Sequence, residues 1–213
     1  MKIIKLEGIY KAYNGIDILK NFNLEVSKGE FIGIKGESGV GKSTLLNIIG
    51  LLESYEGNIF LEGKKINIKK RIEIRNILKK KIGYLFQNFA LIDDLTVYEN
   101  IKIVLKKGSA KERRNMVLEK LRDVGLGDIL DKKVFQLSGG EQQRVAIARL
   151  IIHGSDIILA DEPTGSLDTK NCDIVMDILE RLNSEGKTII IVSHDERVLS
   201  RCSRVVTLNK SYS

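Results

Sequence analysis

Apolar and polar residues alternate in short runs through residues 2–30 of the chain. The stretch Phe22–Val26 is one example, and Asn14-Gly15 provides a turn between two such runs. A period of two is typical of strands that bury one face and expose the other to water. Because Asn58–Glu62 repeats the pattern, we predict an antiparallel sheet in the N-terminal part of the chain.

Continuous apolar runs replace this alternation further along, at Phe31–Ile34, Ile157–Ala160 and Thr188–Val192. Such runs are typical of strands in a parallel sheet whose two faces are both covered. A helical spacing of apolar residues over 45–49 follows the first run, and another over 174–182 precedes the third. Strands that alternate with helices predict an α/β fold with a parallel-sheet core.

Residues 90–154 show the pattern of helices instead. Three hydroxyl residues each stand three positions before a glutamate, an arrangement that satisfies backbone N–H groups at a helix start; the pairs are Thr96 with Glu99, Ser109 with Glu112, and Ser138 with Glu141. We therefore expect one domain over residues 1–213. Within it, residues 1–89 and 155–213 form the α/β core with its antiparallel layer, and residues 90–154 form an inserted helical subdomain.

Composition narrows the class of protein. The chain has 213 residues, 43% of them apolar and 30% charged, which suits one globular domain. Its apolar runs are far shorter than the roughly 20 residues of a membrane span, and its first residues lack a secretory signal. The two cysteines, Cys172 and Cys202, are interpreted as small core residues in a reducing compartment. We expect a cytoplasmic protein, so any membrane-spanning part belongs to another polypeptide.

The net charge of +7 is concentrated in two stretches. Residues 63–82 carry nine Lys or Arg and one Glu, and residues 102–122 carry eight Lys or Arg and two Glu. A solvated lysine-rich face is the simplest interpretation, and attraction to an anionic membrane surface or an acidic partner remains open. Nucleic acid is not expected as a partner, because the first stretch has no aromatic residue and the chain has no Trp.

A glycine-rich loop with the spacing of a phosphate-binding loop lies between the apolar run at 31–34 and the helical pattern after it. Its glycines let backbone N–H groups face phosphate oxygens, and the helix start adds the positive end of its dipole. Lys42 is expected to reach the β- and γ-phosphates and Ser43 to bind magnesium. The candidate nucleotide-binding residues are Gly36, Glu37, Ser38, Gly39, Val40, Gly41, Lys42, Ser43 and Thr44.

Two adjacent carboxylates end the buried run at 157–160. A nucleotide site needs a carboxylate for its metal ion, and hydrolysis needs a group that positions or deprotonates water. Asp161, at the strand end, is the candidate metal ligand. Glu162, one residue further out, is the candidate catalytic base.

The segment Leu137-Ser138-Gly139-Gly140-Glu141-Gln142-Gln143-Arg144 resembles the signature motif of ABC-transporter ATPases. It is also a capped helix start, although two glycines are poor helix formers in a first turn. The resemblance implies that Ser138, Gly139 and Gly140 contact the γ-phosphate of a nucleotide held by the other subunit of a head-to-tail homodimer.

The same resemblance assigns roles to four further residues, which follow the family's order along the chain. Gln87 is the glutamine that touches magnesium and water and relays nucleotide state to a membrane subunit. His194 is the switch histidine at the γ-phosphate, and Asp168 lies in the loop that contacts the partner ATPase. Tyr13 stands where the family has an aromatic residue stacked on adenine, and a half-exposed turn tyrosine is the alternative.

The resemblance implies a P-loop NTPase (RecA-like) fold with an N-terminal antiparallel β layer and an inserted helical subdomain. It implies ATP and Mg²⁺ as cofactors, and an integral membrane permease subunit as partner, with the ATPase peripheral at the inner face of the membrane. The segment Leu159–Asp168 is most similar to ATPases of macrolide and lipoprotein exporters and of bacteriocin export. The expected function is therefore ATP hydrolysis that powers export of a peptide, bacteriocin-like or lipophilic cargo.

Two other functions remain open for a chain with these motifs. An ABC-type ATPase of a mechanical or signalling complex, in cell division or peptide sensing, would carry the same residues without transporting anything. An ATPase that acts on DNA or ribosomes is disfavoured, because such relatives carry long coiled-coil insertions or two ATPase cassettes, and this sequence has neither.

Overall fold

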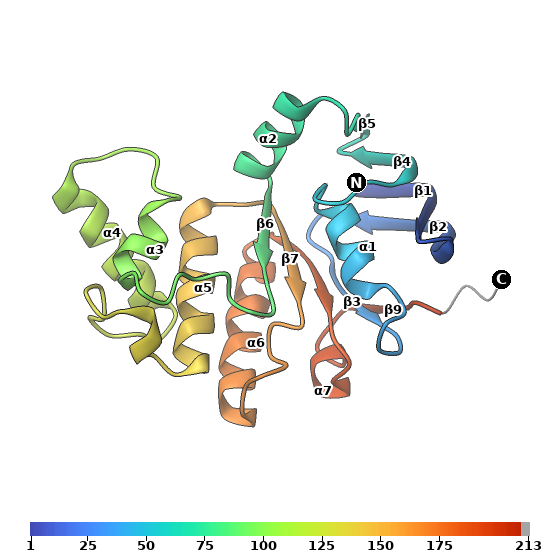
Figure 1. Ribbon diagram of the computed structural model, residues 1–213. Coiled ribbons are helices and arrows are strands. Elements are labelled where there is room, and N and C mark those ends of the chain that lie inside the picture. Colours follow the sequence, from blue (N-terminus) through green and yellow to red (C-terminus); the bar gives the residue numbers. More distant parts are fainter. Residues whose placement is uncertain (210–213) are drawn as a thin grey trace.

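The computed structural model describes residues 1–209, which form two sheets with helices packed around them (Figure 1). The antiparallel sheet has the strand order β2-β1-β4-β5 and contains β1 (Lys2–Tyr13), β2 (Ile16–Ser27), β4 (Glu56–Leu61) and β5 (Lys64–Lys65). The parallel sheet has the order β6-β7-β8-β3-β9 and contains β3 (Phe31–Lys35), β6 (Ile82–Leu85), β7 (Ile157–Asp161), β8 (Thr188–Val192) and β9 (Arg204–Thr207). Both predicted sheets are confirmed.

The helices are α1 (Lys42–Ile49), α2 (Arg71–Lys80), α3 (Val97–Lys102), α4 (Ala110–Asp123), α5 (Gly139–His153), α6 (Thr169–Ser184) and α7 (Glu196–Leu199), with a 3₁₀ turn at Val134–Gln136. All three predicted helix starts are confirmed. Thr96, Ser109 and Ser138 each accept a hydrogen bond from the glutamate N–H three residues later, and that glutamate's carboxylate accepts from the backbone N–H of the capping residue.

The helix α2 was not predicted, because residues 63–82 had been interpreted only through their charge. Its signal lies in Ile74, Ile77 and Leu78, which share one side of a helix at spacings of three and four residues. Ile74 is buried, whereas the basic residues of the helix are exposed, as is Ile72. The short apolar stripe that indicates helix α2 is thus easily overlooked among so many basic residues.

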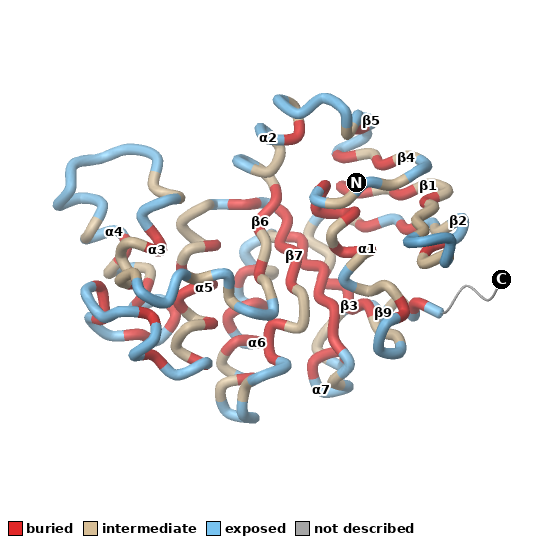
Figure 2. The backbone as a smooth tube through the Cα atoms, viewed as in Figure 1, coloured by how far each residue is buried: buried red, intermediate tan, exposed pale blue. Residues whose placement is uncertain are grey.

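One hydrophobic cluster fills the space between the two sheets, with α1 inside it (Figure 2). Leu45, Leu46 and Ile48 of α1 are completely buried against residues of β3, β7 and β8. All five residues of β8 are buried as well, which explains why its sequence is continuously apolar.

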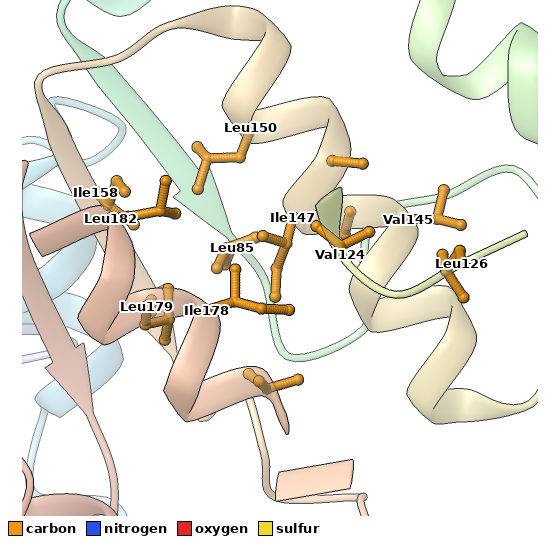
Figure 3. Close-up of a cluster of buried hydrophobic side chains, with 14 of the residues drawn as sticks. Leu85, Val124, Leu126, Val145, Ile147, Leu150, Ile158, Ile178, Leu179 and Leu182 are labelled. Atoms are coloured by element: carbon orange, nitrogen blue, oxygen red, sulfur yellow. The ribbon is translucent and has the colours of Figure 1, made fainter. Parts of the chain in front are cut away.

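A second hydrophobic cluster covers the other face of the parallel sheet (Figure 3). It joins Leu85 of β6 and Ile158 of β7 to Ile147 of α5 and Leu179 of α6, and it continues into α4 through Leu121. The helices of residues 90–154 thus share one core with the sheet. The boundaries predicted at 89/90 and 154/155 stay a prediction, and residues 210–213 of the predicted core lie outside the described residues. Among residues 1–209, no helix is both long and apolar enough to cross a membrane.

We predict that Leu121→Ala lowers the free energy of unfolding by about 2–5 kcal/mol, because it leaves a cavity where the side chain is completely buried. Urea unfolding followed by circular dichroism measures the change. Met116→Ala on the same helix is the control, since Met116 is 43% exposed and its loss costs about 0.5 kcal/mol or less. Equal destabilisation by the two variants would contradict a core that continues into α4.

Candidate functional site

Four neighbouring strands of the parallel sheet place the predicted site residues at one edge. The strands β6, β7, β8 and β3 lie side by side in that order, and all run in the same direction. Gln87 follows β6, Asp161 and Glu162 end β7, His194 follows β8, and the loop 36–43 follows β3. Carboxyl ends of parallel strands are where α/β proteins bind ligands.

Most of these residues line one cavity, although Gly36, Glu37, Val40 and Asp161 do not. It has a volume of about 410 Å³, and we call it the nucleotide cleft; its lining residues are Ser38, Gly39, Gly41, Lys42, Ser43, Thr44, Gln87, Glu162, Val192 and His194. The chain brings these groups together from segments up to about 150 positions apart in the sequence.

The phosphate loop, residues 36–43, is shaped by its glycines and by Lys42. The ammonium group of Lys42 donates hydrogen bonds to the carbonyl oxygens of Gly36 at 2.8 Å and Glu37 at 2.9 Å. Gly41 has φ +103°, and a Cβ atom there would lie 2.4 Å from the Ile18 side chain, so only glycine fits. Within residues 1–209 no side chain caps the start of α1, whose first N–H groups therefore remain available to an anion.

Ser43 and Asp161 form the candidate magnesium site. The Ser43 hydroxyl donates to Oδ1 of Asp161 at 3.1 Å, across the gap between α1 and β7. Burial raises the pKa of Asp161 and is the main cause of the shift, which the Ser43 hydrogen bond opposes. A hydroxyl and a carboxylate are hard oxygen ligands, and Mg²⁺ commonly binds one or two carboxylates together with phosphates and waters. These residues fit Mg²⁺; Ser43 and Gln87 line the nucleotide cleft, and Asp161 adjoins it through its hydrogen bond with Ser43.

Glu162 is held in an unusual backbone conformation beside His194. Its φ of +45° is rare for a residue with a side chain, and its N–H donates to the Val192 carbonyl at 3.0 Å. Nδ1 of His194 lies 2.9 Å from Oε1 of Glu162, while the buried Oε2 has no hydrogen-bond partner among residues 1–209. Glu162 thus lines the nucleotide cleft with one carboxylate oxygen in contact with a histidine and the other buried without a partner among residues 1–209.

The residues Ser138–Gly140, which we call the Ser138 turn, do not line the nucleotide cleft. Ser138 and Gly139 are exposed, and the Ser138 hydrogen bonds to Glu141 hold the pKa of that carboxyl low. Gly140 is buried, and a Cβ atom there would lie 2.4 Å from the Asn171 side chain. A glycine at 140 is thus required by packing within the chain, a reason that the sequence alone did not reveal.

Asp168 and Tyr13 also lie outside the nucleotide cleft. Asp168 caps α6, because its carboxylate accepts hydrogen bonds from the Asn171 N–H at 2.8 Å and the Asn171 side chain at 2.9 Å. These bonds hold the pKa of Asp168 low. Tyr13 is 41% exposed, and the Lys11 ammonium lies 4.6 Å from its ring centre. Their nucleotide contacts stay predictions.

Sequence reasoning missed an arginine that shapes the loop after Gln87. Arg149 donates hydrogen bonds to the carbonyl oxygens of Phe89 at 3.0 Å and Ala90 at 2.7 Å, and both of those residues have positive φ. Burial lowers the pKa of Arg149. The available signal was a charged residue within the apolar stretch of α5, between Ala148 and Leu150.

Comparison with known proteins gives a consistent result. The model of the family described as "ABC transporter" matches residues 19–165. The lipoprotein-releasing system ATP-binding protein LolD of Aquifex aeolicus is 44% identical, and the match covers 97% of this chain and 94% of LolD. The macrolide export ATP-binding/permease protein MacB of Aggregatibacter actinomycetemcomitans is 40% identical over 98% of this chain, which spans only 33% of MacB.

Two solved structures of MJ0796 from Methanocaldococcus jannaschii share the fold. One is described as the dimeric structure of a bacterial ABC transporter cassette; it has a TM-score of 0.89 and 43% identity, and covers 97% of this chain and 94% of that one. The other is a dimer in a post-hydrolysis state bound to ADP and Pi, with a TM-score of 0.90, 40% identity, and 98% and 97% coverage. The predicted fold class is confirmed.

We predict that Asp161→Asn raises the free energy of unfolding at pH 7 in the absence of nucleotide. Since burial raises the folded-state pKa of Asp161, the wild-type chain loses stability as pH rises from the unfolded pKa through the folded one. Asparagine carries no such cost, so the difference shrinks as the pH falls below the unfolded pKa of about 3.9 and the carboxyl becomes protonated in both states.

Urea unfolding at pH 7 and pH 3.5 measures this difference. Asp156→Asn is the control, because Asp156 is a largely exposed residue paired with Lys187 and its replacement changes stability little at either pH. Equal stability of Asp161→Asn and the wild type at pH 7 would show that the buried carboxylate is not unfavourable.

Proposed function

The chain belongs to the ABC transporter family, and we propose that it is the ATP-binding and ATP-hydrolysing subunit of an exporter whose permease is a separate polypeptide. The observation that carries this proposal is the nucleotide cleft, where a phosphate loop, a hydroxyl–carboxylate pair, a glutamate and a histidine come together. Each of these groups has a distinct task in phosphoryl transfer.

Binding of the triphosphate is assigned to the phosphate loop and the start of α1. Backbone N–H groups and the Lys42 ammonium would neutralise the phosphate oxygens. Ser43, Asp161 and Gln87 would hold Mg²⁺, which neutralises charge on the phosphates when bound. Tyr13 is proposed to stack on the adenine ring.

Glu162 is proposed to accept the proton of the attacking water. Glu162 lines the nucleotide cleft, and general-base catalysis of this kind contributes about 10²–10⁴-fold to a rate. His194 is proposed to orient this carboxylate through its 2.9 Å contact and to touch the γ-phosphate. The rest of the acceleration comes from positioning and charge neutralisation.

A head-to-tail homodimer is proposed to complete each site. Ser138 and Gly139 are exposed and the Ser138 turn lies outside its own chain's cleft, so it can contact a triphosphate only across an interface between two copies. It offers a helix start with unpaired N–H groups at Gly139 and Gly140, and Asp168 would contact the partner. The dimers of MJ0796 support this assembly.

The cargo is proposed to be lipophilic or peptide-like, and the direction of transport to be export. The names of LolD and MacB refer to lipoproteins and macrolides, and MacB carries an ATP-binding part and a permease in one chain. A separate permease is proposed for this chain, which would lie at the inner face of the membrane. A peptide or bacteriocin-like cargo is supported by the sequence resemblance alone.

We predict that Glu162→Gln lowers the ATPase rate by about 10²–10⁴-fold and leaves ATP affinity within about twofold, because only the proton acceptor is lost. With ATP and Mg²⁺, this variant accumulates as a dimer in gel filtration, since hydrolysis no longer reopens it. Adding Ser138→Asp abolishes that dimer through repulsion of the γ-phosphate, while the monomer still binds ATP. Rapid turnover by Glu162→Gln would contradict the role of Glu162.

We predict that the protein, expressed in its native cells, co-purifies from membranes with an integral membrane permease. Vesicles that contain the complex then hydrolyse ATP and lose a lipophilic or peptide cargo from the membrane, whereas complexes with Glu162→Gln do neither. ATP hydrolysis coupled to a membrane partner that moves no cargo would instead favour the mechanical or signalling complex.

A further inference from the structure

Three buried polar side-chain atoms have no hydrogen-bond partner among residues 1–209, and all three lie in one region. They are Oε1 of Gln143, Nε of Arg144 and Oε2 of Glu162. Such groups are rare in native proteins, and each calls for a physical explanation. Here they flank the connection between the start of α5, which carries the Ser138 turn, and the segment after β7, which carries Glu162.

Gln143 forms the first half of this connection. Its side chain is completely buried, and its amide Nε2 donates a 2.7 Å hydrogen bond to the carbonyl oxygen of Pro163. Pro163 is the only proline of the chain and directly follows Glu162. A glutamine on α5 therefore fixes the peptide group next to Glu162, although it does not line the nucleotide cleft.

Asn171 and Arg144 form the second half. Nη1 of Arg144 donates to Oδ1 of Asn171 at 3.0 Å, and the other side of the same amide is bonded to Asp168. Asn171 also fills the space that a side chain at Gly140 would need. The helices α5 and α6 begin at the same edge of the molecule (Figure 1), and these contacts lock their first turns together.

We propose that Gln143, Arg144 and Asn171 form a strut that transmits the position of the Ser138 turn to Glu162 of the same chain. The inference rests on the proposed function, in which the turn acts on the partner's ATP and Glu162 acts on ATP in its own cleft. The strut therefore couples the two sites of the dimer. Gln143 and Asn171 are positioning residues, since neither lines the nucleotide cleft.

The backbone at Glu162 makes this coupling physically effective. A residue held at φ +45° keeps that conformation only while its neighbours enforce it, and the Pro163 carbonyl is one of the enforced groups. A shift of about 1 Å in a catalytic group is enough to lower a rate by about 10²-fold. If α5 moves when the Ser138 turn contacts a phosphate, the orientation of the Glu162 carboxylate would therefore change.

Gln143→Met tests the strut. Methionine keeps the volume and removes the unpaired Oε1 together with the donor, but it leaves the Pro163 carbonyl without that hydrogen bond, so a moderate loss of folding stability accompanies the change. We expect kcat to fall by about 10-fold or more with KM for ATP within about twofold, and the Hill coefficient for ATP to fall toward 1, since coupling of two sites permits at most 2. ATP-driven dimerisation of Gln143→Met combined with Glu162→Gln persists.

Asn171→Ala is the second variant and keeps the test decisive if a change at the buried Gln143 impairs folding. Asn171 is only partly buried, and its replacement gives the same loss of kcat and cooperativity. The matched control is Arg181→Ala, which removes another hydrogen bond between α6 and the helical region, at the Asp123 carbonyl, without touching residues 162–171. This control retains wild-type kcat and Hill coefficient.

The outcomes separate the two proposals. A wild-type Hill coefficient in both Gln143→Met and Asn171→Ala would overturn the strut. A loss of ATP-driven dimerisation in proportion to the loss of turnover would also overturn it, because the contacts would then only support the fold. A wild-type chain that neither hydrolyses ATP nor dimerises would instead refute the proposed function.

Discussion

The convergence of helix starts and strand ends at one edge of the parallel sheet is the constraint on which the site depends. In a parallel sheet with right-handed crossovers, every helix returns antiparallel to its strands, so α1, α5 and α6 all begin where the strands finish (Figure 1). Each helix start carries unpaired N–H groups and a partial positive charge. The edge therefore attracts anions before any side chain contributes.

Two residues at this edge, Asp161 and Glu162, adopt states that destabilise the folded chain. Burial disfavours the charged form of Asp161, and Glu162 adopts a left-handed backbone conformation. The large apolar clusters on both faces of the sheet keep these strand ends in place. The apolar core thus stabilises the fold, and this stabilisation offsets the local cost of holding the Asp161 and Glu162 carboxylates in fixed positions.

Local patterns predicted the parts of the site that depend on local physics. The helix start at Ser138 follows from a glutamate three positions later, and the phosphate loop is closed by Lys42, which bonds carbonyl groups five and six positions before it. The contacts of Gln143 with Pro163 and of Gly140 with Asn171 join residues 20 and 31 positions apart, so they appear only once α5 and α6 are packed. The Ser138 turn lies outside the cleft of its own chain. Its position is explained by the proposed assembly of two chains, which the sequence pattern of one chain does not reveal.

The continuous helix α5 restricts how this chain can change over evolution. One inserted residue would rotate everything beyond it by about 100° and advance it by 1.5 Å, which would turn Gln143 away from Pro163 or Leu150 away from the sheet. Insertions and deletions are therefore excluded between 139 and 153, while the connection between α3 and α4 is free to vary in length at its exposed residues 106–108. Divergence within α5 must proceed by exchange of single amino acids at constant spacing.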